Sequence, residues 1–390
     1  MRSSRARLIT LVSVTLATAV SQSFGRFTYS LLFTDARDDF GVSNTVAGAM
    51  GSANLVAYLL GSLVVSVVVG RWGLATVSHV GLIGVVIGLG FLAWGPGVGV
   101  FAAALVLTGF AAAGVWVTAP AIATGLVEDD RRGRAMGIVG TGVGIGIVAA
   151  SLLDTAVGGD DFRAVYVIEF AIGVAVVVAV LASLPRRAST SAVRLSGLGE
   201  LRRVPNWGRL LLEYALFAFA MAMVMTFTVG YLEDDARLDR GVANGAFLLI
   251  GIGTLAGGPL FGPLTDRIGR LRSQASGLAL MTVSTLLITT GQPGIALVAA
   301  FAFGISFTGG PVTVGARVSD HLDGDAFGAA YGVVTIAFGA GLAAGPQIGG
   351  VLADLTDSAR PALWASAAIS ACALAITLSE GRETSASRPC

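Results

Sequence analysis

Residues 262–272 read GPLTDRIGRLR, a short charged turn that separates two long apolar runs. Neither Val242–Phe261 before the turn nor Ser273–Thr290 after it carries a charged side chain. About 20 apolar helical residues cross a bilayer, and backbone groups inside it must bond within the helix. We therefore interpret the segment as a tight turn between two membrane-spanning helices, retained in the cytoplasm by its three arginines.

The composition of the whole chain agrees with a membrane protein. Of 390 residues, 54% are hydrophobic and 13% are charged, whereas a soluble domain carries about 25% charged residues. A net charge of +1 provides no basic patch for a nucleic acid. The two cysteines and two histidines lack metal-ligand spacing, and no phosphate loop or catalytic set is found, so neither a metal, a cofactor nor an enzymatic activity is expected.

Apolar runs divide the chain into twelve expected membrane spans. The first follows three arginines and is about 26 residues long, which is enough to cross a bilayer with tilt and too long for a cleaved signal peptide. The spans are expected at residues 8–33, 44–69, 74–95, 98–126, 134–153, 162–184, 207–232, 241–261, 273–291, 293–316, 326–350 and 361–379. Arginines concentrate in the even-numbered connections, which predicts a multi-pass protein of the cell membrane with both termini cytoplasmic.

The two halves of the chain resemble each other. At an offset of about 195 residues, Gly109–Thr118 falls on Gly304–Thr313. A similar offset relates the glycines of the fifth and eleventh spans, with Gly137, Gly144 and Gly146 falling on Gly332, Gly339 and Gly341. Such matches predict two six-helix bundles. The expected domains are an N-terminal bundle at 1–185, a cytoplasmic linker at 186–206, and a C-terminal bundle with a short cytoplasmic tail at 207–390.

The pattern Gly-x-x-x-Asp-Arg-x-Gly-Arg at 262–270 resembles the loop signature of the major facilitator superfamily of transporters. The resemblance covers nearly the whole chain. It implies an all-α membrane protein with twelve transmembrane helices in two six-helix bundles related by a pseudo-twofold axis. A small-molecule substrate is then expected near the membrane midplane between the bundles.

The same resemblance implies a conformational latch made of Asp266, Arg267 and Arg270. In the superfamily the loop aspartate pairs with a nearby arginine against a helix of the same half, which here is the helix expected to start near Asp325. The matching loop of the first half has Gly70 in place of the aspartate. The latch is therefore expected in the second half alone.

Short motifs resemble one branch of the superfamily more narrowly. Gly25–Tyr29 resembles the Gly-Arg-Phe-x-Tyr signature of the YbfB/YjiJ-like branch, as do Asp39–Ser43 and Gly142–Gly146. Two features differ from proton-driven members. Leu105 occupies the region where many of them carry an arginine, and the glycine run of the fifth span continues into Ala150 without the Gly-Pro pair common in antiporters.

Ionisable side chains within the spans are the first candidates for function, because charge is costly in lipid. Arg26 lies in a helix that lines the cavity of the superfamily, and we expect it to bind a carboxylate or phosphate of the substrate. The alternatives are an ion pair with Glu169 or a side chain that extends to the membrane surface. Glu213 and Glu169 are candidates for coupling to a co-transported proton or sodium ion; the alternatives are contact with cytoplasmic water for Glu213 and a structural role for Glu169.

Polar and aromatic side chains on the expected cavity helices form a second set of substrate-binding candidates. They are Tyr29, Asn54, Tyr58, Trp116, Thr226 and Thr308. Asn54 and Tyr58 are one helical turn apart and share a helix face. For the threonines the alternative is an interhelical hydrogen bond.

Together these features predict a secondary-active transporter that moves a small organic solute across the bilayer by alternating access, as a monomer. A passive facilitator and a non-transporting ligand sensor (a transceptor) on the same fold are the alternatives. Both a monocarboxylate and a hydrophobic drug-like compound fit the predicted cavity.

Overall fold

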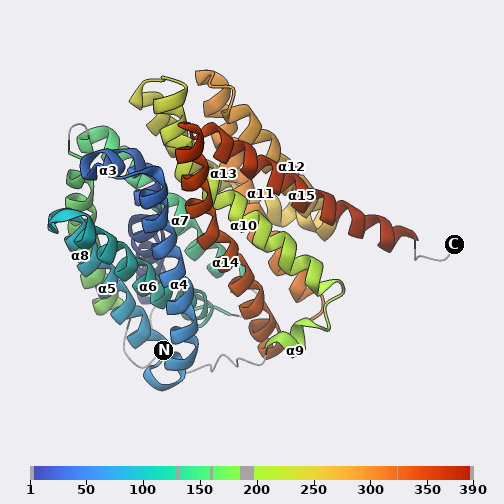
Figure 1. The fold of residues 1–390 in the computed structure, drawn as a ribbon. Coiled ribbons are helices and arrows are strands. Elements are labelled where there is room, and N and C mark those ends of the chain that lie inside the picture. The colour runs from blue at the N-terminus through green and yellow to red at the C-terminus, as the bar shows by residue number, and fades with distance from the viewer. Residues whose placement is uncertain (1–3, 129–131, 159–160, 185–196, 323, 387–390) are drawn as a thin grey trace. The chain divides into compact units, whose positions relative to one another are not determined.

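The computed structural model describes residues 4–128, 132–158, 161–184, 197–322 and 324–386, which form helices and no strand (Figure 1). The chain divides into two compact units. The first comprises Met1–Ser43 and Ala49–Ala192, and the second comprises Asn44–Gly48 and Val193–Cys390. The all-α prediction is confirmed. Most of the predicted linker lies outside the described residues, and its end contains a short helix, α9 (Gly197–Leu201).

The first unit begins with one long helical run. Helix α1 (Ser4–Thr18) passes into a π-helical segment, η1 (Ala19–Phe27), and then into α2 (Thr28–Leu31) and α3 (Phe33–Phe40). The other elements are α4 (Asn44–Trp72), α5 (Leu74–Trp94), α6 (Gly97–Thr124), α7 (Arg132–Leu153), η3 (Asp154–Gly158) and α8 (Arg163–Ser183). Segment η1 packs against α6 and α7, and α5 packs against α6 and α8.

The second unit repeats this pattern of long helices. Its elements after α9 are α10 (Trp207–Gly230), η4 (Tyr231–Asp235), α11 (Arg240–Ile268), α12 (Arg270–Ile288), α13 (Pro293–Ser319), α14 (Gly324–Thr356) and α15 (Arg360–Ala386). Helix α11 packs along α13, α10 packs along α14 and α15, and α12 packs against α13 and α15.

Every predicted span is helical, and eleven helical segments in the described parts of the chain are long and apolar enough to cross a membrane. Helix α12, which corresponds to the span predicted at 273–291, is not among the eleven. Its two arginines, Arg270 and Arg272, together with its serines, threonines and glutamine, lower its mean hydropathy. Several helices extend beyond the predicted ends, and α13 and α15 continue to Ser319 and Ala386.

The GPLTDRIGRLR turn is shorter than the sequence suggested. Helix α11 continues to Ile268, and Gly269 alone separates it from α12. Gly269 has a φ of 88°, and Gly73, which separates α4 from α5, has a φ of 78°. Positive φ is the region where a side chain strains the backbone, so each junction requires glycine.

Glycines allow the same close helix contacts in both units. A Cβ atom at any of four glycines would meet a backbone carbonyl of the neighbouring helix. The pairs are Gly61 with Phe110 and Gly109 with Asn54 in the first unit, and Gly257 with Ile305 and Gly304 with Ile250 in the second. The predicted internal repeat near an offset of 195 residues is therefore visible in the packing of α4 with α6 and of α11 with α13.

The predicted register of the fifth-span glycines is wrong by about one helical turn. In α7 a Cβ at Gly142 would meet the Thr15 carbonyl, and in α14 a Cβ at Gly341 would meet the Ala215 carbonyl. These two glycines are 199 residues apart rather than 195. Glycines recur so often along both helices that several offsets produce matches, and only the packing selects one.

Candidate functional site

The π-helical segment η1 presents Arg26 in a buried position of the first unit. Arg26 is 8% exposed, and its Nη1 donates a hydrogen bond to the Gln22 Oε1 at 2.6 Å. Its guanidinium carbon lies 3.9 Å from the centre of the Tyr58 ring, a cation–π distance. The wider turn of a π-helix is frequent at functional sites, and here it extends over the whole stretch from Ala19 to Phe27.

No carboxylate neutralises Arg26 within the described residues. Its Nε has no hydrogen-bond partner there, although it is buried. The ion pair with Glu169, one of the sequence-based alternatives, is absent, because Glu169 accepts a hydrogen bond from the Thr28 hydroxyl at 2.6 Å instead. Arg26 is thus a buried cation held by a neutral amide and an aromatic ring. A charge kept in this way is able to bind an anionic or strongly accepting group.

Asn54 positions the segment that carries Arg26. Its Nδ2 lies 3.0 Å from the Gly25 carbonyl, 2.7 Å from the Leu105 carbonyl and 3.1 Å from the Thr108 Oγ1. These contacts connect α4, η1 and α6. The amide nitrogen is therefore occupied by the protein itself, and its contribution to a substrate site is to hold the backbone next to Arg26.

Tyr29 and Trp116 have different surroundings. Tyr29 is buried, with its ring 6.0 Å from that of Phe33 and 6.1 Å from that of Phe101. Trp116 of α6 is half-buried, and its indole makes no hydrogen bond to the described residues. Tyr29 therefore belongs to the aromatic packing, whereas no hydrogen bond to the described residues holds the Trp116 indole.

The threonines predicted in the second unit also differ. Thr308 donates to the Thr254 carbonyl at 3.1 Å and so connects α13 to α11. The Thr226 hydroxyl of α10 has no hydrogen-bond partner among the described residues, although the residue is buried. Of the two, Thr226 retains its hydrogen-bonding capacity for a solute.

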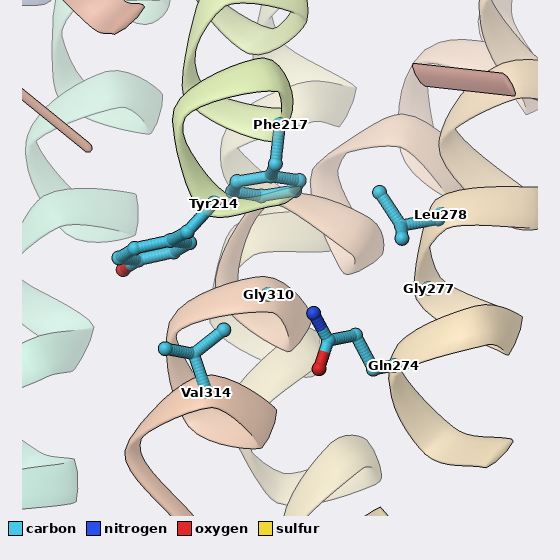
Figure 2. A pocket seen from close by; sticks show the side chains of 7 residues that line it. All are labelled: Tyr214, Phe217, Gln274, Gly277, Leu278, Gly310 and Val314. Carbon is cyan, nitrogen blue, oxygen red and sulfur yellow. The ribbon is translucent and has the colours of Figure 1, made fainter. Parts of the chain in front are cut away.

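A small pocket lies in the second unit between three helices (Figure 2). Its lining residues are Tyr214 and Phe217 of α10, Gln274, Gly277 and Leu278 of α12, and Gly310 and Val314 of α13. It has room for about one water molecule. Figure 2 shows the Gln274 amide extending from α12 toward α13, below the Phe217 ring.

The Gln274 amide connects this pocket to a buried group of charges that the sequence analysis missed. The Arg317 Nη1 donates to the Glu213 Oε2 at 2.9 Å and to the Gln274 Oε1 at 2.8 Å. The Arg317 Nη2 donates to both carboxylate oxygens of Glu380, at 2.7 and 2.8 Å. The Gln274 Nε2 donates to the Glu213 Oε2 at 2.9 Å. We call these four residues, from α10, α12, α13 and α15, the Arg317 cluster.

The sequence did not predict the cluster because two of the predicted spans end just before its residues. Arg317 was assigned to a connection after a span ending at 316, and Glu380 follows a span predicted to end at 379. In the structure both residues lie inside longer helices and are buried. The alternative for Glu213, contact with cytoplasmic water, is not observed, since Glu213 is 1% exposed.

Glu169 of α8 is a further fully buried carboxylate, in the first unit. It is 0% exposed, its Oε1 accepts from Thr28, and its Oε2 has no partner in the described parts of the chain. Unlike Glu213, it has no arginine beside it.

The residues predicted as a latch lie at the surface of the second unit. The Arg270 Nη1 lies 2.6 Å from the Asp266 Oδ1, and the Arg270 Nε lies 3.0 Å from the Asp320 Oδ2. Hydrogen bonds to Asp320 and Asp266 raise the pKa of Arg270 above its ordinary value. The observed partner at the end of α13 is Asp320; the side chain of Asp325 is outside the described residues. Arg267 is exposed and has no ion pair to a described residue.

Long apolar helices in two units with repeated glycine contacts, and buried charges within them, define a multi-pass membrane protein, and its family identifies it as a transporter rather than an enzyme. Residues 18–378 match the family model described as "Uncharacterised MFS-type transporter YbfB". The chain belongs to this family of the major facilitator superfamily.

Known relatives agree with this assignment. The chain is 28% identical over 382 residues to the chloramphenicol resistance protein of Streptomyces lividans, covering 93% of this chain and 94% of that protein. It is 25% identical over 346 residues to the uncharacterized MFS-type transporter YceJ of Bacillus subtilis, covering 85% and 86%. Over 145 residues, 36% of each chain, it is 29% identical to the class C tetracycline resistance protein of Escherichia coli.

The fold is shared with a solved transporter structure. A bacterial homolog of the human lysosomal transporter Spinster, in its inward-facing and unoccupied conformation, matches with a TM-score of 0.78 and 16% identity over 98% of both chains. This match confirms the predicted major facilitator fold. The fold implies a small-molecule substrate.

Proposed function

We propose that this protein is a secondary-active exporter of a small organic solute, working by alternating access at the cell membrane with both termini in the cytoplasm. Export is supported by two relatives that are named as resistance proteins. The topology is supported by the arginines of the even-numbered connections.

The observation that carries the proposal is Arg26, a buried cation without a carboxylate partner among the described residues. An uncompensated charge at this depth costs stability, and substrate binding is the function that explains its retention. The fixed guanidinium selects a solute with a carboxylate or another strong acceptor group. In the first unit Tyr58 and Trp116 supply aromatic contacts, and Asn54 and Tyr29 hold the helices in place. In the second unit Thr226 offers a hydroxyl, and Thr308 holds α13 against α11.

Energy coupling is assigned to a proton at Glu213 or Glu169, which both have buried carboxyl groups. The latch residues Asp266, Arg267 and Arg270 are assigned a role in setting the equilibrium between the transporter's conformations. A passive facilitator would need neither carboxylate, and a ligand sensor would bind solute without exchanging it across the membrane.

Counterflow in proteoliposomes tests the proposal. Vesicles loaded with an unlabelled compound take up its labelled form only if the protein exchanges it. Chloramphenicol, tetracycline and a series of monocarboxylates form the test panel. The expected result is exchange of at least one compound, with accumulation when a pH gradient is imposed. Exchange without accumulation under any proton or sodium gradient would indicate a facilitator, and binding without exchange would indicate a sensor.

Arg26→Ala and Arg26→Lys test the site, with Arg7→Ala as the matched control. Arg7 is an exposed arginine of the same helical run, in α1. We expect Arg26→Ala to reduce exchange at least tenfold, because a charge-assisted hydrogen bond contributes about 1.5–3 kcal/mol. Arg26→Lys keeps the charge but loses the fork of donors, so an intermediate loss is expected. Unchanged exchange in Arg26→Ala would remove Arg26 from the site.

A further inference from the structure

The side chain of Gln22 sets the orientation of the Arg26 guanidinium. The Gln22 Oε1 accepts a hydrogen bond from the Arg26 Nη1 at 2.6 Å, and the Gln22 Nε2 donates to the Ala112 carbonyl of α6 at 3.3 Å. The bond to α6 fixes which end of the amide faces Arg26, because only the nitrogen end can donate to a carbonyl. Gln22 is 2% exposed, so the protein rather than solvent determines this arrangement. We call Gln22 and Arg26 the amide–guanidinium pair.

The orientation of the guanidinium directs one of its edges toward a ligand. Nη1 lies on the side of the Cδ atom, and the opposite edge carries Nε and Nη2, two parallel donors that suit a bidentate carboxylate. The Arg26 Nε is buried and has no hydrogen-bond partner among the described residues. The Tyr58 ring covers a face of the guanidinium at 3.9 Å, so an acceptor for Nε has to lie in the guanidinium plane. A buried donor without an acceptor is costly, and a ligand carboxylate at this edge removes that cost.

The neutral charge of Gln22 is as important as its geometry. A glutamate of the same length would place a carboxylate on Nη1 and neutralise the arginine within the protein. Glutamine satisfies one donor and leaves the positive charge uncancelled. Among the described residues of the first unit Arg26 is the single buried arginine, so the pair matches one negative charge.

The internal repeat shows that helix packing does not account for the amide–guanidinium pair. In the first unit a Cβ at Gly142 of α7 would meet the Thr15 carbonyl, and in the second a Cβ at Gly341 of α14 would meet the Ala215 carbonyl. The following stretch of α10, Leu216–Phe227, has no charged side chain. The same contact between helices therefore forms without an arginine, which leaves ligand binding as the purpose of the pair.

We infer that the amide–guanidinium pair is a site selective for organic monoanions that carry a carboxylate, and that Gln22 is the positioning residue that determines this selectivity. The solute carboxylate binds at the Nε–Nη2 edge of Arg26, while Gln22 holds the Nη1 end without competing for the charge. An uncharged solute leaves the arginine uncompensated and binds more weakly. This inference rests on the proposed function, to which it adds the charge of the solute and a second residue.

Thermal stability of the purified wild-type protein tests the selectivity without requiring transport. The probes are formate, acetate, lactate and benzoate, each compared with its methyl ester, with sodium chloride to match the ionic strength. We expect at least one carboxylate to raise the melting temperature in a saturable manner, and its ester to need at least a tenfold higher concentration for the same shift. Stabilisation by none of the carboxylates, or equal stabilisation by acid and ester, would overturn the inference. Stabilisation by uncharged chloramphenicol without any carboxylate effect would do the same.

Substitutions at Gln22 separate its charge from its shape. Gln22→Glu supplies the counter-charge from the protein, so carboxylate affinity is expected to fall at least tenfold and the preference for acid over ester to disappear. Gln22→Met has a similar length and no charge, so the preference is expected to persist while affinity falls about two- to threefold, because the orienting bond is lost. Gln292→Glu, the same change at an exposed glutamine of the second unit, is the matched control and should alter neither.

Equal effects of the two Gln22 variants, with the acid preference intact in both, would show that Gln22 is only a structural residue. Should Gln22→Glu fail to fold, Arg26→Gln is the second variant. It removes the charge, so acid and ester should stabilise it equally, and a persisting acid preference would refute the site.

Counterflow distinguishes failure of this inference from failure of the proposed function. Acid-selective binding without exchange across the membrane would refute the proposed function and leave the site in place. Exchange of uncharged compounds alone, unaffected by Gln22→Glu, would refute the site and leave the transporter in place.

Discussion

Replacing Arg317 by methionine is expected to be among the most destabilising single changes in the second unit. Methionine approximates the length of the arginine side chain but carries no charge and no donors. Arg317→Met removes the contacts at 2.9 Å to Glu213 and at 2.7 and 2.8 Å to Glu380. It removes the ion pairs that two buried carboxyl groups, Glu213 and Glu380, form with Arg317. Breaking a buried ion pair by removing one partner costs about 3–5 kcal/mol.

A second substitution, added to Arg317→Met, shows through the change in stability which carboxyl group is ionised. If Glu213 is neutral and Glu380 is ionised, the ion pair lost in Arg317→Met is the one with Glu380. Arg317→Met/Glu380→Gln should then recover most of the lost stability, because replacing a whole buried pair by neutral residues is often nearly neutral. Arg317→Met/Glu213→Gln should recover less than about 1 kcal/mol, since it replaces a neutral acid by a neutral amide.

Heating in detergent followed by size-exclusion chromatography measures these differences. The temperature that leaves half of the protein monodisperse, and the half-life at a fixed temperature, are compared among the variants, because membrane proteins often unfold irreversibly. Arg317→Leu is the control for side-chain shape and should behave as Arg317→Met. Equal recovery by the two double variants, or a loss below about 1 kcal/mol in Arg317→Met, would refute the charge assignment.

Three further outcomes are expected. Gly109→Ala should destabilise the first unit by about 1–3 kcal/mol, because the added Cβ meets a backbone carbonyl. The control is Gly137→Ala, whose Cβ meets nothing within 4 Å in the described residues. Its melting temperature should be unchanged or slightly raised. Tyr58→Leu removes the ring 3.9 Å from the Arg26 guanidinium and should weaken solute binding about tenfold in a thermal-shift titration. Unchanged solute binding would show that the ring does not contribute to binding. Asp266→Asn breaks an exposed ion pair, so stability should change by less than about 1 kcal/mol while the counterflow rate changes; unaltered counterflow would argue against a latch.

Hydropathy predicted the helices well because the membrane imposes a local rule. A residue in a span must be apolar enough for lipid, and backbone groups must bond within the helix, whatever the helix later packs against. The exception is instructive. Helix α12 carries Ser273, Gln274 and other polar residues that face its neighbours in the unit, so its mean hydropathy is low although its place in the repeat predicts a span.

The sequence predicted Arg26 as a candidate because it is a single charge within an apolar run. The sequence did not predict the residues that surround Arg26. The ring of Tyr58 and the amide of Gln22 hold it, and the expected alternative partner, Glu169, bonds to Thr28. The Gln22 contact has the i, i+4 spacing of an α-helix, but Tyr58 and Glu169 lie on other helices, and spacing along one helix does not predict contacts between helices.

The sequence alone determined the all-helical membrane fold, the glycine turn and the superfamily, since each is encoded as a periodic or local pattern along the chain. Only the tertiary structure decided that Glu213, Arg317 and Glu380 meet, because they are separated by 104 and 63 residues and lie at helix ends that hydropathy leaves undefined. Charge pairing acts over a few ångströms in space, and distance along the chain carries no information about it.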